Sequence, residues 1–327
     1  FDDNDRMKPS PYYDRIVDVK ITAHPEGRLA PRVWLATANL AGDGLLQKIA
    51  SAPQTGIVGP FPAAIIDAVA AYRPEAVTDL RSMDGQHQFI VALREILVVP
   101  SLRETPAIAD YIRYLQTISA HFAFVDRFFP TANPRAREGS ADFHGKPNSV
   151  GEIISIAHQL YVLKSYGVEG DFAEFGCFKG FSSSMLSFAC KQLDLKMHIF
   201  DSFEGLPEAT GIDAGDTRFF EGQFACSREE VESNLLKNGM KLNRATLIEG
   251  YYEDSLTEEL HDQHPFRPAA VVLLDCDYYS STVVAMDWLN RYVGVGTVLL
   301  FDDWFSYGDD GSLGQQKALA EWLDKHP

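Results

Sequence analysis

The stretch Ala269-Ala270-Val271-Val272-Leu273-Leu274, followed directly by Asp275-Cys276-Asp277, decides the fold of this chain. Six consecutive apolar residues predict a buried parallel strand at 269–274. A second apolar run, 297–301, also ends on acids, Asp302 and Asp303. Between the two runs we expect a helix with Ser280 as its cap and Gly294 after its end. Its apolar face would carry Val284, Trp288 and Tyr292.

A strand, a helix and a second strand in this order form a crossover unit, which makes the two strands parallel neighbours. Both acidic ends then lie at the carboxyl edge of the sheet, where open α/β sheets bind ligands. Carboxylates that converge there repel one another unless a cation lies among them. Oxygen ligands favour Mg²⁺, Mn²⁺ or Ca²⁺ over zinc. Acids at strand ends also serve as helix caps and turn residues, but for the set of four we favour a metal site.

Composition limits the class of protein. The chain has 327 residues with 46% hydrophobic content, which suggests two domains. Its formal net charge of -17 argues against a nucleic-acid partner. Its apolar runs are shorter than the roughly 20 residues of a membrane span. Four widely spaced cysteines, Cys177, Cys190, Cys226 and Cys276, are expected to be reduced and mostly buried. We therefore expect a soluble, cytoplasmic protein.

The first part of the chain, 1–129, is predicted to be an accessory domain, α/β or mostly helical, of unknown role. A strand is expected at 16–21 and helices at 62–72, 86–97 and 106–129. The composition of 130–148 changes to Pro, Gly, Asn and charged residues, which indicates a linker or a lid.

The second domain, 149–327, opens with capping-box spacing at 149–152 and a helix with one apolar stripe. A strand at 172–177 then enters a turn that contains Gly176 and Gly180, with serines at the start of the next helix. Such a turn lets a backbone approach a ligand and leaves helix N–H groups free for a carboxylate or phosphate. It lacks the G-x-G-x-x-G order of dinucleotide sites.

Asp201 follows the next strand, about 20 residues after the glycine turn, and an acid there can bind a ribose diol. The ligand could be a nucleoside or a dinucleotide, and a simple turn residue is the alternative interpretation. The Gly- and Asp-rich loop 206–225 carries Phe219 and Phe220 and is expected to be functional or mobile. A capping box at 227–230, a strand at 246–249 and a helix at 315–325 complete the pattern.

Read together, these segments resemble the class I S-adenosylmethionine-dependent methyltransferases, and more narrowly the macrocin O-methyltransferase family, whose members methylate sugar hydroxyls. The matching motifs are Asp171-Phe172-Ala173-Glu174-Phe175-Gly176-Cys177-Phe178-Lys179-Gly180, Phe200-Asp201-Ser202-Phe203-Glu204-Gly205-Leu206-Pro207, Gly250-Tyr251-Tyr252-Glu253-Asp254-Ser255-Leu256, Leu274-Asp275-Cys276-Asp277-Tyr278-Tyr279-Ser280-Ser281-Thr282 and Phe301-Asp302-Asp303. The resemblance covers 149–327 and implies a Rossmann-like α/β sheet with helices on both faces.

The resemblance also implies the site. Its S-adenosylmethionine pocket would involve Glu174, Gly176, Cys177, Gly180, Asp201, Ser202, Gly250, Tyr252, Asp254 and Asp275. Asp201 would hold the ribose, and the turn at 250–254 would border adenine. A Mg²⁺ ion would be held by Asp275, Asp302 and Asp303, with Asp277 as the base. The sequence departs from the family in two places. Phe181 stands where a further glycine is usual, and the two strands that normally close the sheet do not occur before Pro327. We expect these strands either to be absent or to follow Pro327.

The functional hypothesis is a Mg²⁺-dependent transfer of a methyl group to a hydroxyl of a sugar or glycosylated natural product. The competing hypotheses are a metal-dependent methyltransferase of catechols or small phenols, with Phe219, Phe220 and the aromatic cluster at 122–129 as walls, an NAD-dependent sugar oxidoreductase, and a non-catalytic binding subunit. The expected partner is a small-molecule or glycoside acceptor. We expect binding neither to nucleic acid nor to a membrane, and a homo-oligomer is possible.

Overall fold

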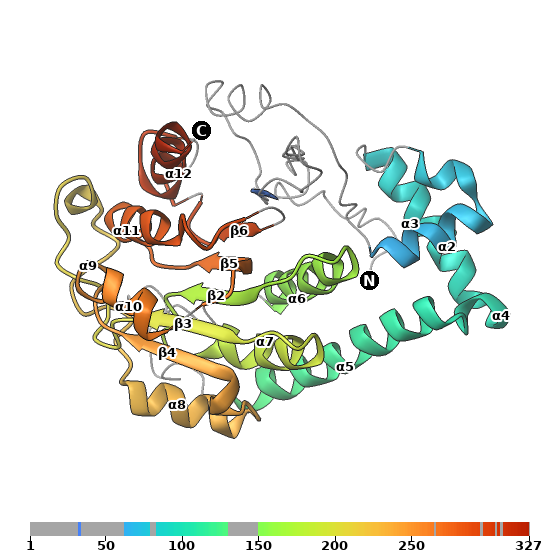
Figure 1. Cartoon of the computed structure of the whole chain (residues 1–327), viewed down its shortest axis with the longest axis horizontal. Coiled ribbons are helices and arrows are strands. Elements are labelled where there is room, and N and C mark those ends of the chain that lie inside the picture. The colour runs from blue at the N-terminus through green and yellow to red at the C-terminus, as the bar shows by residue number, and fades with distance from the viewer. Residues whose placement is uncertain are drawn as a thin grey trace, which may run out of the picture.

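The computed structural model describes residues 32–33, 62–78, 83–129, 150–264, 266–294, 297–304, 306–307 and 310–326. Its centre is a parallel sheet with the strand order β1-β6-β5-β2-β3-β4 (Figure 1). The strands are β1 (Arg32–Val33), β2 (Asp171–Phe175), β3 (Met197–Asp201), β4 (Ala245–Glu249), β5 (Ala269–Leu274) and β6 (Val298–Phe301). The expected strands of the second domain are confirmed within a few residues.

The chain reverses its direction of travel along the sheet between β2 and β5. From β2 it proceeds outward through α7 (Phe181–Gln192), β3, α8 (Arg228–Lys237) and β4. It then returns to the other side of β2 as β5, and α11 (Tyr279–Leu289) connects β5 to β6. The carboxyl ends of β2 and β5 therefore flank a topological switch point, where sheets of this kind bind ligands.

Alternating side chains on the strands build two cores, one on each face of the sheet. Phe172 belongs to a core with α5 (Pro106–Phe128), α6 (Val150–Ser165), α7 and α8. The next residue, Ala173, belongs to a core with α9 (Tyr252–Ser255), α10 (Glu258–Gln263), α11 and α12 (Gly314–Lys325). Because both faces are covered, every residue of β2, β3 and β5 is buried, which explains the continuous apolar sequence of β5.

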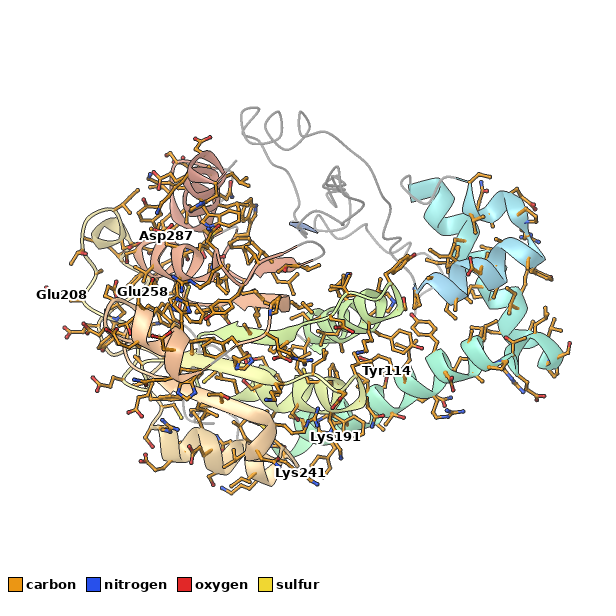
Figure 2. All side chains as sticks on the ribbon, in the orientation of Figure 1. Tyr114, Lys191, Glu208, Lys241, Glu258 and Asp287 are labelled. Atoms are coloured by element: carbon orange, nitrogen blue, oxygen red, sulfur yellow. The ribbon has the colours of Figure 1, made fainter. Side chains whose placement is uncertain are left out.

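The N-terminal helices form a third core. It contains α2 (Ala63–Tyr72), α3 (Met83–Val98) and the first half of α5, with α4 (Pro100–Arg103) between the last two. From Tyr114 onward α5 packs on the sheet side of the molecule, and the hydroxyl of Tyr114 donates to Ala157 O of α6 at 2.7 Å (Figure 2). The expected helices of this region are confirmed. The predicted strand at 16–21 and the linker at 130–148 lie outside the described residues, and the division into domains stays a prediction.

Helix capping follows the sequence in one case and departs from it in another. The side chain of Ser227 accepts from Glu230 N, as the capping-box spacing predicts. The prediction for Ser280 was wrong, because α11 begins at Tyr279 with Tyr278 as its N-cap residue. Its free N–H groups are satisfied by a distant acid: the carboxylate of the buried Asp213 accepts from Tyr279 N at 2.9 Å and from Ser280 N at 3.0 Å. These two bonds anchor the loop 206–225 to α11, the helix that follows Asp275 and Asp277.

No helix in the described part of the chain is long and apolar enough to cross a membrane.

We expect Gly176→Ala to unfold much more easily than Gly211→Ala. Both glycines have positive φ angles, 87° and 57°, so each substitution adds the backbone cost of about 1–2 kcal/mol. A Cβ atom at Gly176 would also lie 1.7 Å from Asp275 O, whereas one at Gly211 has no heavy atom within 4 Å. Overpacking therefore adds roughly 1–3 kcal/mol at Gly176 alone. Urea unfolding of both variants measures this difference, and equal free energies of unfolding would contradict it.

Candidate active site

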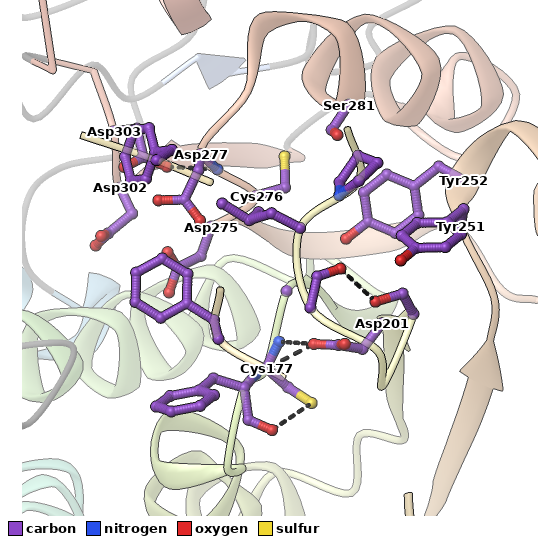
Figure 3. Close-up of a pocket in the computed structure, with 18 of the residues that line it drawn as sticks. Cys177, Asp201, Tyr251, Tyr252, Asp275, Cys276, Asp277, Ser281, Asp302 and Asp303 are labelled. Atoms are coloured by element: carbon purple, nitrogen blue, oxygen red, sulfur yellow. Dashed lines mark hydrogen bonds between the residues drawn. The ribbon is translucent and has the colours of Figure 1, made fainter. Parts of the chain in front are cut away.

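A cavity of about 330 Å³ opens at the carboxyl edge of the sheet, at the switch point between β2 and β5. Figure 3 shows that the labelled acids after β5 and β6 lie on one side of it, with Cys177 and Asp201 across from them. The lining residues are Gly176, Cys177, Phe178, Ser182, Asp201, Ser202, Gly205, Leu206, Pro207, Arg218, Phe219, Phe224, Gly250, Tyr251, Tyr252, Glu253, Asp275, Cys276, Asp277, Ser281, Asp302, Asp303 and Ser306.

The backbone that borders the cavity is fixed by hydrogen bonds that continue the sheet one residue past its strands. Gly176 N donates to Phe200 O at 2.9 Å, and Asp275 N donates to Phe175 O at 2.9 Å. Asp302 N donates to Leu274 O at 3.0 Å in the same way. The residues that the sequence assigns to the site are therefore held by the register of the strands.

The carboxylate of Asp201 fastens the glycine turn to β3. Its Oδ2 atom accepts from Cys177 N at 2.7 Å and from Phe178 N at 3.1 Å, while Oδ1 accepts from Phe203 N at 2.8 Å. Burial raises the pKa of Asp201, and these N–H groups oppose that shift. Three acceptor positions are thus occupied, so Asp201 has limited capacity left for a ribose hydroxyl.

Glu174 lies behind the cavity and is fully buried in the sheet. Its two carboxylate oxygens accept from the hydroxyls of Ser182 and Ser183 in the first turn of α7. Burial raises the pKa of Glu174 to about 7, although both hydroxyls oppose the shift. Glu174 therefore fixes the start of α7, from which Ser182 reaches the cavity.

The acidic side of the cavity combines repulsion with one strong internal bond. Asp277 has a left-handed backbone with φ of 58°, and its N–H donates to Asp303 Oδ2 at 2.9 Å. Burial raises the pKa values of the Asp277 and Asp303 carboxyls, and the negative charge of Asp303 raises the pKa of Asp277 further. Arg218 opposes these shifts from the facing loop. The charge of Arg218 therefore does not offset the raised pKa values of Asp277 and Asp303.

Among the residues that the structure describes, no three Asp, Glu, His or Cys side chains are grouped closely enough to hold a metal ion. The predicted ligands Asp275, Asp302 and Asp303 nevertheless line the same side of the cavity as Asp277 (Figure 3). Their chemistry is that of hard oxygen donors.

Most of the predicted site residues meet in this cavity. The exceptions are Glu174, which lies behind it, Gly180, which is the N-cap residue of α7, and Asp254, which is exposed on α9. Of the predicted aromatic walls, Phe219 lines the cavity, but Phe220 is exposed and Phe122 and Phe129 lie in a core.

The sequence did not single out Arg218. Its guanidinium forms a bidentate ion pair with Asp216 and lies 5.3 Å from the ring of Phe219 and 5.1 Å from that of Tyr307. These contacts join the loop 206–225 to the segment after β6. The only sequence signal was the unusual length of this loop.

Comparison with known proteins identifies the part of the chain around this cavity. Residues 155–312 match the family model described as macrocin-O-methyltransferase (TylF). This part of the chain belongs to the macrocin O-methyltransferase family. The protein is therefore an O-methyltransferase, and the oxidoreductase hypothesis is set aside.

Two relatives of this methyltransferase come from Streptomyces. An 8-demethyl-8-(2,3-dimethoxy-alpha-L-rhamnosyl)-tetracenomycin-C 4'-O-methyltransferase of Streptomyces olivaceus is 29% identical over 189 residues, which are 50% of this chain and 70% of the relative. A demethyldecarbamoylnovobiocin O-methyltransferase of Streptomyces niveus is 27% identical over 146 residues, 42% of this chain and 53% of the relative. The solved structure of the O-methyltransferase NovP shares the fold, with a TM-score of 0.51 and 20% identity over 65% of this chain and 90% of that chain.

We predict that Glu174→Gln removes a pH-dependent loss of stability. In the unfolded chain this carboxyl ionises near its ordinary pKa of 4.5, but in the folded protein only near 7. Between these values the folded state binds more protons, so rising pH lowers stability, by up to about 3 kcal/mol in total. Urea unfolding of both proteins at pH 4.5 and 7.5 should show the difference between them changing by this amount. A constant difference would contradict the prediction.

Proposed function

We propose that this methyltransferase moves the methyl group of S-adenosylmethionine to a hydroxyl of a sugar or glycosylated natural product in a Mg²⁺-dependent reaction. The observation that carries the proposal is the meeting of the glycine turn and the four aspartates in one cavity. The name of the Streptomyces olivaceus relative, an O-methyltransferase of a rhamnosyl-tetracenomycin C, supports this class of acceptor.

Several features of the cavity fit the sulfonium nucleoside. The glycine turn offers backbone close to the ligand, and the backbone N–H of Ser182, in the first turn of α7, can bond a carboxylate while its hydroxyl stays on Glu174. Tyr251 and Tyr252 line the same cavity and supply flat apolar surface beside a base. We infer that Asp201 holds one ribose hydroxyl with its remaining acceptor capacity, and mainly keeps the turn in place.

The acidic side fits Mg²⁺ by charge and by donor type. The crowded carboxyls of Asp277 and Asp303 have raised pKa values, which a cation beside them would lower. Asp275, Asp302 and Asp303, which line the same side of the cavity, would hold the ion. Bound there, Mg²⁺ would acidify a hydroxyl of the acceptor and fix its orientation.

The residues of the chain then have separate roles. The glycine turn and Asp201 hold the methyl donor, while Phe219 and Arg218 border the acceptor side. A bond forms between the acceptor oxygen and the methyl carbon as the bond from that carbon to sulfur breaks, and S-adenosylhomocysteine leaves without charge. The hydroxyl proton passes to the carboxylate of Asp277. Alignment of the two reactants supplies much of the rate.

A phenolic acceptor is the second candidate, since the rings of Phe178, Phe219 and Phe224 all line the cavity. Phe224 lies edge-on to the other two, with centroid distances of 5.6 Å to Phe178 and 6.4 Å to Phe219. Such a wall can pack a catechol as well as the apolar aglycone of a glycoside.

The test is to incubate the full chain with S-adenosylmethionine and two panels of acceptors, glycosides and catechols, each with Mg²⁺ and with a chelator. We expect methylated glycosides by mass spectrometry and loss of activity with the chelator. Methylation of catechols alone would favour the second candidate. Binding of S-adenosylhomocysteine without any methylation would favour a non-catalytic subunit, and chelator-insensitive turnover would remove the role of the metal.

We expect Asp277→Asn to lower kcat by about 10²–10⁴-fold, because the amide cannot accept the hydroxyl proton. Asparagine tolerates the left-handed backbone of this position, so the turn should persist. The affinity for S-adenosylhomocysteine, measured by calorimetry, should stay within about threefold. Asp262→Asn, at an exposed position on α10, is the matched control and should keep full activity. Normal kcat in Asp277→Asn would exclude this residue as the base.

A further inference from the structure

Gln315, in the first turn of α12, connects the two acid-bearing segments through its side chain. The residue is fully buried. Its Nε2 atom donates to Leu274 O, at the end of β5, at 3.1 Å. Its Oε1 atom accepts from Asp303 N, after β6, at 3.0 Å. One carboxamide therefore binds Leu274, which precedes Asp275, and the backbone of Asp303 itself.

This carboxamide takes the place of a peptide group in the sheet. The paired register of β5 and β6 ends at Leu274 and Phe301, and the last backbone bond runs from Asp302 N to Leu274 O. Beyond it, Asp275 N bonds toward β2 instead. Gln315 supplies the acceptor for Asp303 N and a second donor for Leu274 O, with the donor and acceptor of an ordinary amide. The hydrogen-bonded pairing of the two strands is thereby extended by a side chain.

The extension reaches Asp277 through Asp303. The Asp303 carboxylate accepts from Asp277 N at 2.9 Å, and Tyr278 N donates to Cys276 O at 2.6 Å across the same tight turn. A φ of 58° is uncommon for a residue other than glycine, and these two bonds help to hold Asp277 in it. The bonds thus run from Gln315 to the Asp303 backbone, and from the Asp303 side chain to the Asp277 backbone.

We propose that Gln315 is a positioning residue for methyl transfer, which sets the spacing of the acids after β5 and β6. This role depends on the proposed function, in which these acids hold the metal ion and accept the hydroxyl proton. Gln315 does not line the cavity and acts through Asp303. The residues that border the donor, such as Gly176 and Asp201, lie on the opposite side and have no bond to α12 among those described above.

The neighbouring Gln316 provides a matched control. It is also a glutamine in the first turn of α12, it is 5% exposed, and its Nε2 atom donates to Trp304 O at 2.8 Å. Replacing either glutamine by methionine removes a buried carboxamide at nearly constant length. Only the change at position 315 removes the acceptor of Asp303 N.

The experiment compares Gln315→Met and Gln316→Met in the full chain by three measurements: amide hydrogen exchange at Asp303, binding of Mn²⁺ and of S-adenosylhomocysteine by calorimetry, and kcat. For Gln315→Met we expect at least about tenfold faster exchange at Asp303, about tenfold weaker Mn²⁺ binding and a similar loss of kcat, with nucleoside affinity within threefold. Gln316→Met should stay within about threefold of the parent protein in all of them.

Equal effects of the two substitutions, or unchanged exchange in Gln315→Met, would overturn the proposal. If Gln315→Met fails to fold, Gln315→Glu serves in its place, because it keeps an oxygen for Asp303 N and should preserve slow exchange there while it weakens the bond to Leu274 O. Fast exchange at Asp303 in that variant would likewise refute the link. Since exchange does not depend on catalysis, an inactive parent protein would refute the proposed function and leave the test of Gln315 intact.

Discussion

The close approach of Gly176 to the carbonyl of Asp275 is the constraint on which the site depends. These residues end adjacent parallel strands, and the space between them is too small for any side chain. The N–H groups of the same two residues continue the hydrogen bonding of the sheet by one step, because Gly176 N donates to Phe200 O and Asp275 N donates to Phe175 O. The glycine-turn side and the acidic side of the cavity therefore lie on the ends of two adjacent, hydrogen-bonded strands, β2 and β5. Their separation is set by backbone geometry and not by flexible side chains.

Dipoles, more than opposite charges, hold the carboxylates in and behind this cavity. The chain carries a formal charge of -17, and Arg218 is the one Lys or Arg among the described residues that line the cavity. Backbone N–H groups hold Asp201, hydroxyls hold Glu174, and the Asp277 N–H holds Asp303. These dipoles fix the carboxylates without neutralising them. The lining of the cavity holds more Asp than Arg and Lys residues, which suits the sulfonium donor and the divalent cation of the proposed reaction.

The sequence predicted those features that depend on neighbours along the chain. The apolar runs gave the strands, the spacing of Ser227 and Glu230 gave a cap, and acids after two adjacent strands gave one side of the cavity. It failed where the partner is remote. Asp213 caps α11 from 66 positions before Tyr279, and no local sequence pattern shows that Asp213, and not Ser280, is the cap. Gln315 bonds Leu274 across 41 positions, and a glutamine in a helix start carries no such signal. Glu174 matches a motif, yet alternation along β2 turns it away from the cavity.

The placement of Gln315 in α12 also gives the molecule an order of assembly. Synthesis proceeds from the amino end, so the glycine turn, Asp201 and both acidic segments leave the ribosome before this glutamine does. The half of the pocket that receives the nucleoside can settle while the acids still lack their amide partner. On the proposed role of Gln315, competence for chemistry then depends on a late segment of the chain.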